Sequence, residues 1–274
     1  MRIATRLIFN AFLVILLIAP FSKTSGQSSV DTALAQVYLE RAIVLADEGL
    51  EDSLGWYLQE AAGLYQRAGL QELFLQKHLS DYQYVYENGY FSPVIEALQV
   101  IVATSRQQLG DYHPLLAPWY YHLGRSLQMR GDNTEALQWV TVCLTLRRSM
   151  QPMPLLDFAA THILLGVCHI GLYQFSEAIA QYNKALEIRK RELGPRHALT
   201  AMVLNNLGAA HRHFGLNDIA MQYYQEALSI REEVLPPDHP HLGISIFNLA
   251  TLYSDLGLTK KAIELYQQAM RIYQ

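Results

Sequence analysis

The sequence is poor in the residues that mark several classes of protein. Only two of its 274 residues are cysteine, which excludes a disulfide scaffold and a cysteine-rich zinc module. Glycine and proline are also scarce, at 16 and 10 residues, which excludes a fibrous chain. Charged residues make up 17% and hydrophobic residues 51%, which excludes a disordered chain. The net charge of −4 argues against a nucleic-acid-binding protein, because such proteins carry a basic face.

The longest apolar run lies at the start of the chain. Arg2 and Arg6 precede an apolar segment over 7–19, Pro20 ends it, and small polar residues follow. This order is typical of a secretory signal peptide. The apolar segment would form a helix of about 20 Å, shorter than the bilayer core of about 30 Å. We therefore predict a signal peptide over 1–26, with an uncleaved membrane anchor as the alternative.

Cleavage after Gly26 would leave an acidic protein. It would remove three basic residues and no acidic one, so that 18 basic and 25 acidic residues remain and the net charge becomes −7. No later segment approaches the ~18 apolar residues of a membrane helix. No Asn-x-Ser/Thr glycosylation site occurs. We predict a protein that is secreted or periplasmic, with no stable membrane span after signal cleavage.

A 42-residue repeat organises the rest of the chain. Small residues recur at this interval where two helices would approach closely, and tyrosines recur where they would fill the adjacent space. Single glycines recur where one helix would end in a left-handed turn. Each unit is therefore predicted to be a helix hairpin. The recurring positions are Gly124, Gly166, Gly208 and Ala250; Ala136, Ala178, Ala220 and Ala262; Gly131, Tyr173, Gly215 and Gly257; and Tyr182, Tyr224 and Tyr266.

The turns and linkers repeat as well. Polar residues that follow the glycines, Thr134, Ser176 and Asp218, are predicted to cap the second helix of each hairpin. Linkers between hairpins contain proline and a recurring histidine, and proline is favoured only in the first turn of a helix. We predict that these histidines serve the junctions between hairpins. They are His113, His197 and His239.

Three stretches, over 204–208, 226–232 and 235–240, resemble tetratricopeptide repeats of the 42-residue variety found in kinesin light chains and many bacterial proteins. The resemblance implies an all-α, right-handed solenoid of antiparallel helix hairpins. It is strong from about residue 89. We predict a degenerate helix pair over 27–70 and an array of about five hairpins over 71–274. The upstream helices are expected over 31–48, 51–66 and 71–88.

The resemblance also implies a concave groove, lined mainly by the first helix of each hairpin, that binds a protein or an extended peptide. Asparagine amides would bond a peptide backbone, and Arg125 and Arg212 would hold a carboxylate. Apolar Ile163, Val167 and Ile170 would interrupt the polar lining. The alternative is that these residues form solvated helix faces. The polar residues are Tyr121, His122, Arg125, Gln128, Asn205, Asn206, Arg212, His213, Asn248, Thr251, Ser254 and Asp255.

No motif of a nucleotide-binding, metalloprotease or hydrolase site occurs, so we expect no enzyme activity and no cofactor. The ten histidines do not have the spacing of a metal site and are interpreted as structural or solvated. Cys143 and Cys168 fall on helices that should be neighbours. In an exported protein they could form a disulfide, and the favoured interpretation is two buried thiols.

The last predicted helix, over 260–273, raises the question of what covers its apolar side. Its apolar residues Ala262, Leu265, Ala269 and Ile272 cannot all pack against one helix, and solenoids normally end in a helix with a polar outer face. Two explanations compete. Either the chain self-associates through this end, or it is the sensing or regulatory part of a larger system. Proteins of similar sequence in bacteria often continue into a peptidase or signalling domain.

Overall fold

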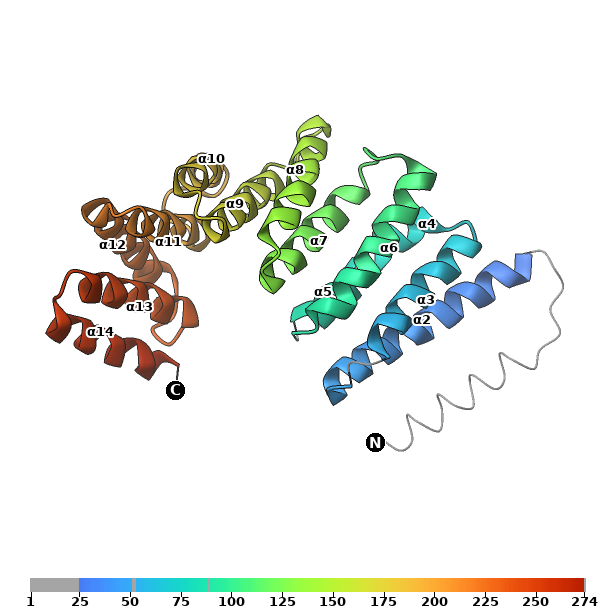
Figure 1. Ribbon diagram of the computed structural model, residues 1–274, viewed down its shortest axis with the longest axis horizontal. Helices are drawn as coiled ribbons and strands as arrows, with labels where there is room; N and C mark the ends of the chain where they lie inside the picture. The colour runs from blue at the N-terminus through green and yellow to red at the C-terminus, as the bar shows by residue number, and fades with distance from the viewer. Residues whose placement is uncertain (1–24, 51–52, 88, 274) are drawn as a thin grey trace. The chain divides into compact units, whose positions relative to one another are not determined.

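The structure is a computed structural model that describes residues 25–50, 53–87 and 89–273. The predicted signal peptide lies outside this range except for Ser25 and Gly26, which begin the first described helix. The described residues form thirteen helices and no strand, which confirms the predicted all-helical class (Figure 1). The helices are α2 (Ser25–Glu48), α3 (Leu54–Arg67), α4 (Gln71–Lys77), α5 (Leu79–Glu87), α6 (Phe91–Leu109), α7 (Leu116–Arg130), α8 (Asn133–Ser149), α9 (Leu155–Gly171), α10 (Phe175–Leu193), α11 (Ala198–His213), α12 (Asn217–Val234), α13 (Pro240–Asp255) and α14 (Thr259–Ile272).

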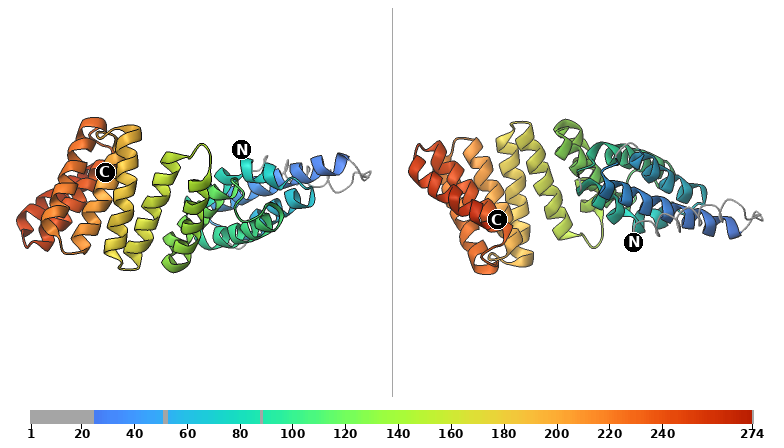
Figure 2. Two further views of the ribbon diagram at one scale, coloured as in Figure 1. Left: turned by 90° about the horizontal axis from the view of Figure 1, so that it is seen from above. Right: turned by 90° about the horizontal axis from the view of Figure 1, so that it is seen from below.

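The chain divides into two compact units, residues 1–119 and 120–274, with the boundary inside α7. In the first unit, α2 and α3 form a hairpin, and α3 packs against α6. In the second unit, α9 with α10, α11 with α12, and α13 with α14 form three successive hairpins (Figure 2). Each second helix also packs against the first helix of the following hairpin. This repeated stacking is that of a helical solenoid.

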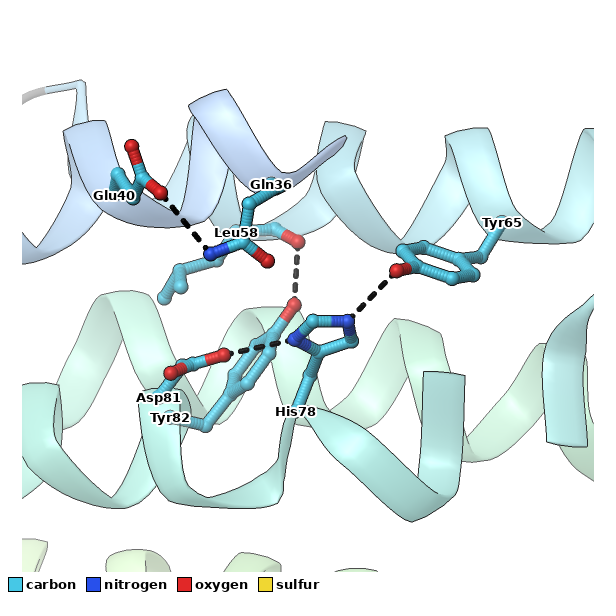
Figure 3. A network of polar contacts seen from close by, with 7 residues as sticks. All are labelled: Gln36, Glu40, Leu58, Tyr65, His78, Asp81 and Tyr82. Carbon is cyan, nitrogen blue, oxygen red and sulfur yellow. Dashed lines mark hydrogen bonds and ion pairs between the residues drawn. The ribbon is translucent and has the colours of Figure 1, made fainter. Parts of the chain in front are cut away.

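In the first unit, the helix predicted over 71–88 is divided into α4 and α5, so that prediction was wrong. The backbone at His78 is not helical, with φ −109° and ψ 9°. Its imidazole is buried and bonds at Nδ1 to Asp81 Oδ2 and at Nε2 to the hydroxyl of Tyr65 of α3, each over 2.9 Å (Figure 3). A second bond to α3 runs from the Tyr82 hydroxyl to the carbonyl of Leu58. The break therefore lies where α4 and α5 are bonded to α3.

In the second unit, the small residues of the repeat lie where helices cross most closely. A Cβ atom added to Gly208 would stand 2.6 Å from Cδ1 of Tyr224, and one added to Gly166 would stand 2.4 Å from Cε1 of Tyr182. Both tyrosine rings are buried. The predicted pairing of a glycine on the first helix with a tyrosine on the second is confirmed, and it sets how closely the two helices of a hairpin approach.

In the turns within hairpins, the predicted left-handed conformation of the glycines is confirmed and the predicted helix caps are wrong. Gly131, Gly215 and Gly257 have φ between 74° and 101°, in the left-handed region. Thr134, Ser176 and Asp218 do not cap their helices, because each helix begins one residue before them. The residues at the capping positions make no capping side-chain bond. At the linkers, His197 and His239 do cap, since each Nδ1 accepts a bond of 3.1 Å from a backbone N–H two residues on.

Tyr173 occupies the turn position that is glycine in the other units, with φ 60°. In a residue with a side chain, the left-handed conformation is about 1–2 kcal/mol higher in energy than the right-handed one. Tyr173→Gly is therefore expected to raise the free energy of unfolding by about 1 kcal/mol, after allowance for the greater freedom of glycine in the unfolded chain. Thermal unfolding should show a midpoint higher by roughly 2–4 °C.

Tyr173→Ala is the matched control, because it removes the 82% exposed ring and keeps the Cβ atom that causes the strain. We expect no gain in stability from it. An equal gain from both variants would show that the exposed ring, and not the backbone conformation, lowers the stability of the wild-type protein.

Candidate functional site

The candidate site is the first-helix face of the second unit, defined as the side chains that α7 from Tyr120 on, α9, α11 and α13 leave exposed or half-buried. The predicted binding residues lie on three of these helices, at the hairpin position where the sequence placed them. Four are on α7, four on α11 and the remaining four on α13. The structure joins some of them in pairs and leaves the others apart.

Asn205 and Asn248 bond to each other between α11 and α13. Asn248 Nδ2 donates to Asn205 Oδ1 over 3.0 Å. Asn205 is only 7% exposed, whereas Asn248 is half-buried. Asn205 therefore orients the amide of Asn248, and its own side chain is largely withdrawn from the surface. Asn206, the next residue on α11, is half-buried.

Arg212 and Asp255 form a second bridge between the same two helices. Arg212 Nη1 donates to Asp255 Oδ2 over 2.6 Å, and the side chains are 21% and 44% exposed. His213 follows Arg212, and its ring stacks on that of Phe175 with 5.7 Å between centroids. Burial, and then the nearby Arg212 cation, lower the pKa of His213, which favours a neutral imidazole. The cation of Arg212 is thus balanced by Asp255.

The residues of α7 form a separate group around an aromatic ring. The Arg147 guanidinium carbon lies 5.0 Å from the centroid of the Tyr121 ring, within the range of a cation–π contact. The ring of His122 meets that of Tyr121 edge-on, with 5.3 Å between centroids. Burial raises the pKa of Tyr121, so its phenol stays neutral and can donate a hydrogen bond. Arg125 and Gln128 are half-buried further along the helix.

Between these groups, α9 contributes the apolar residues that the sequence placed in the lining. Ile163 is 9% exposed and belongs to a core cluster with Val203 and Leu207 of α11. Val167 and Ile170 pack partly against the same cluster. Thr251, on α13, donates its hydroxyl to the carbonyl of Phe247 and accepts a bond from Tyr266. These residues serve mainly to stack the helices, so apolar side chains of α9 lie between the α7 group and the α11–α13 group.

Sequence reasoning missed a row of buried arginines, although their 42-residue spacing was visible. Arg147, Arg189 and Arg231 lie near the ends of α8, α10 and α12 and are 2–6% exposed. Each Nη1 donates to a backbone carbonyl in the next first helix, over 2.6–2.8 Å. Arg147 and Arg231 also bond a hydroxyl of that helix, that of Thr161 or Ser245. The row therefore joins each hairpin to the following one.

The same arginines bring positive charge close to the first-helix face. Burial lowers the pKa of Arg189 and of Arg231, yet a guanidinium stays protonated in proteins. Within the described residues, the buried Nε atoms of these two arginines have no hydrogen-bond partner. Arg147 lies against Tyr121 and lowers the pKa of that phenol, partly opposing burial. The α7 group is thus a basic, aromatic surface that suits a negatively charged ligand group.

The remaining features of the part of the chain that the structure covers are its metal-ligating side chains, its cysteines and its most apolar helices. There, no three His, Cys, Asp or Glu side chains are grouped so that they could hold a metal ion. Cys143 and Cys168 are buried and form no disulfide with each other, and burial raises the pKa of Cys168 to about 12, so it remains a thiol. None of the described helices is both long and apolar enough to cross a membrane.

Comparison with known proteins concerns the repeats and the fold. Residues 157–233 and 205–274 match the tetratricopeptide repeat family. A kinesin-light-chain-like repeat protein of Podosopora anserina is similar in structure, with a TM-score of 0.58 and 20% identity over 75% of this chain and 94% of that one. BtubC (BKLC) from P. vanneervenii has a TM-score of 0.56 and 25% identity over 90% of this chain and 91% of that one.

A Rap protein solved in complex with competence and sporulation factor has a TM-score of 0.62 and 15% identity, over 97% of this chain and 70% of that one. No curated protein sequence matches the chain. The chain thus carries tetratricopeptide repeats over 157–274, and its fold is that of kinesin-light-chain-like repeat proteins.

Proposed function

We propose that this chain is a non-catalytic scaffold that binds another protein or an extended peptide along the first-helix face of its second unit. The observation that carries the proposal is the polar arrangement between α11 and α13, where Asn248 is oriented by Asn205 and Arg212 is held by Asp255. Two fixed polar groups on adjacent helices can bond two points of an extended chain. The Rap protein of similar fold, solved with competence and sporulation factor, supports a binding role.

The chemistry of each group fits a peptide. An asparagine amide both donates and accepts, as a peptide bond requires. Arg212 uses one guanidinium nitrogen for Asp255, and a guanidinium has five N–H groups in a fork that matches a carboxylate. Because these side chains are already held, binding costs little side-chain entropy. The basic α7 group would take an acidic part of the same ligand.

We also propose that the protein is exported, on the strength of its N-terminal sequence. The charged start, short apolar run and small-residue exit over 1–26 are those of a signal peptide. The site of action would be the periplasm or the extracellular space, and an uncleaved leader would instead anchor the protein to the membrane.

The binding proposal is tested with a phage-displayed library of random peptides selected on the purified wild-type chain. The affinity of selected peptides is then measured by fluorescence anisotropy for Asn248→Ala/Arg212→Ala, which removes both of the fixed polar groups. Loss of a charge-assisted contact and an amide contact is expected to weaken binding about 100-fold.

The matched control is Asn183→Ala/Lys184→Ala, which removes the same kinds of group from exposed positions on the second helix α10. It should bind as the wild type does. Far-UV circular dichroism confirms that both variants are folded. Equal affinity for the wild type and Asn248→Ala/Arg212→Ala would place the binding surface elsewhere and contradict the proposal.

The export proposal is tested by the intact mass of the chain expressed with its leader. If the leader is cleaved, the mass should be that of a chain that begins at Gln27.

A further inference from the structure

The outer side of the last hairpin exposes large apolar side chains at positions that are covered in the hairpin before it. Met221 and Leu228 of α12 pack against a core cluster that includes Leu249 and Leu252 of α13. Their equivalents 42 residues later, Ile263 and Met270, are 50% and 61% exposed. The side of α13 and α14 that would meet a further helix is thus uncovered in the described chain.

The same comparison on the first helices shows a change of residue type. Asn205 on α11 is almost wholly buried, and its equivalent on α13 is Phe247, which is 50% exposed. The Phe247 ring lies 5.2 Å from that of Tyr266, so the two hold each other in place. A polar residue thus stands at the covered position and an aromatic residue at the exposed one. This is the reverse of what a solvated end of a solenoid requires.

These side chains define the end face, formed by Ile244, Phe247, Ile263, Met270 and Tyr273, which are 39–61% exposed. The Tyr273 ring is seated against Gly243, where an added Cβ would stand 2.7 Å from the ring. Several large apolar side chains exposed on the two helices of one hairpin are typical of an interaction site in a folded protein. A specific interface buries about 800 Å² per partner. The single 14-residue helix α14 presents little area by itself, so the residues of α13 contribute part of the interface.

The charges on α14 indicate which partner fits. Glu264 and Arg271 are exposed and seven residues apart, so they lie on one side of the helix, about 10 Å apart along its axis. If two copies of α14 pack antiparallel about a two-fold axis midway between these residues, each Glu264 faces Arg271 of the second copy. A two-fold interface repeats every contact, so one complementary pair becomes two.

We propose that the end face binds the end face of a second copy of this chain, with the two α14 helices antiparallel. On each side of the two-fold axis, Ile263 of one copy packs beside Met270 of the other, with Gln267 at the axis and the Glu264–Arg271 pairs at the border. The apolar residues supply the affinity and the charges set the direction of the helices. Because the face is small, we expect a dimer with a dissociation constant of about 10 μM.

Sedimentation equilibrium of the full chain tests the proposal. Wild type is expected to dimerise, and Glu264→Arg or Arg271→Glu should each weaken association about tenfold or more, because each places like charges together twice in the dimer. The double variant Glu264→Arg/Arg271→Glu restores opposite charges across the interface and should recover wild-type association. Glu232→Arg makes the same charge change as Glu264→Arg at an exposed position on α12, away from the end face, and should have no effect.

Each other outcome contradicts the proposal. A wild-type chain that stays monomeric would show that the end face meets a different protein or a following segment of a longer chain. A dimer that neither single variant weakens would place the interface elsewhere. Failure of the double variant to recover would exclude the antiparallel arrangement. The substituted residues are exposed, so all variants are expected to keep the wild-type circular dichroism spectrum.

Discussion

Gly208→Ala is expected to lower the free energy of unfolding by about 2 kcal/mol. The added Cβ would stand 2.6 Å from Cδ1 and 2.7 Å from Cε1 of Tyr224, a ring that is 1% exposed and has little room to move. Overpacking of a core costs about 1–3 kcal/mol or more, and the higher helix propensity of alanine returns only about 1 kcal/mol. Chemical denaturation followed by circular dichroism measures the change.

The control is the same substitution at Gly63, in the middle of α3. A Cβ there would meet only the flexible end of the Arg67 side chain, at 3.3 Å from Nη1. Gly63→Ala should therefore raise the stability by up to about 1 kcal/mol through helix propensity alone. Opposite signs for the two variants would establish that Gly208 is required by packing. An unchanged or more stable Gly208→Ala protein would show that the Tyr224 ring can shift, and the packing argument would fail.

Arg189→Ala is expected to have a still larger effect, a loss of about 3 kcal/mol. Arg189 is 6% exposed, and its Nη1 donates to the carbonyl of Leu199 over 2.6 Å. Truncation removes this charge-assisted bond between α10 and α11 and leaves a cavity where the aliphatic stem was packed. The loss is partly offset because a costly buried cation is also removed. Denaturation with urea, monitored by circular dichroism, measures it.

Arg191→Ala is the matched control two residues along the same helix. Its side chain is 60% exposed and pairs with the neighbouring Glu192, so the change should stay within about 0.5 kcal/mol. Arg189→Lys keeps the charge but lacks the planar fork, and it should recover little of the lost stability. Wild-type stability of Arg189→Lys would mean that position 189 needs only a cation, and the specific role of the guanidinium would be disproved.

Much of the fold followed from local sequence features. The 42-residue period located the helices of the second unit, since small residues, tyrosines and turn glycines act within one hairpin. The left-handed conformation at Gly131, Gly215 and Gly257 was predictable because it depends on the turn itself. The predicted caps failed for a related reason. Thr134, Ser176 and Asp218 have capping side chains, but each helix starts one residue earlier and places them inside its first turn.

The break at His78 could not be predicted from its neighbours in sequence. Periodicity alone favoured one helix over 71–88, and the deciding contact is with the Tyr65 hydroxyl, 13 residues earlier on a different helix. The arginine row gave a different kind of signal. Its spacing was visible, but spacing does not distinguish a solvated arginine from one that bonds the next helix at Leu199 or His241.

The sequence by itself determined the repeat, the all-helical class and the helix on which each candidate binding residue lies. These depend on interactions within one hairpin. Only the tertiary structure decided which of those residues pair, because Asn205 with Asn248 and Arg212 with Asp255 are 43 residues apart. That spacing is one residue more than the repeat, so the partners are not equivalent positions. They meet because adjacent first helices are offset where they stack, and the offset is set by the packing of whole hairpins.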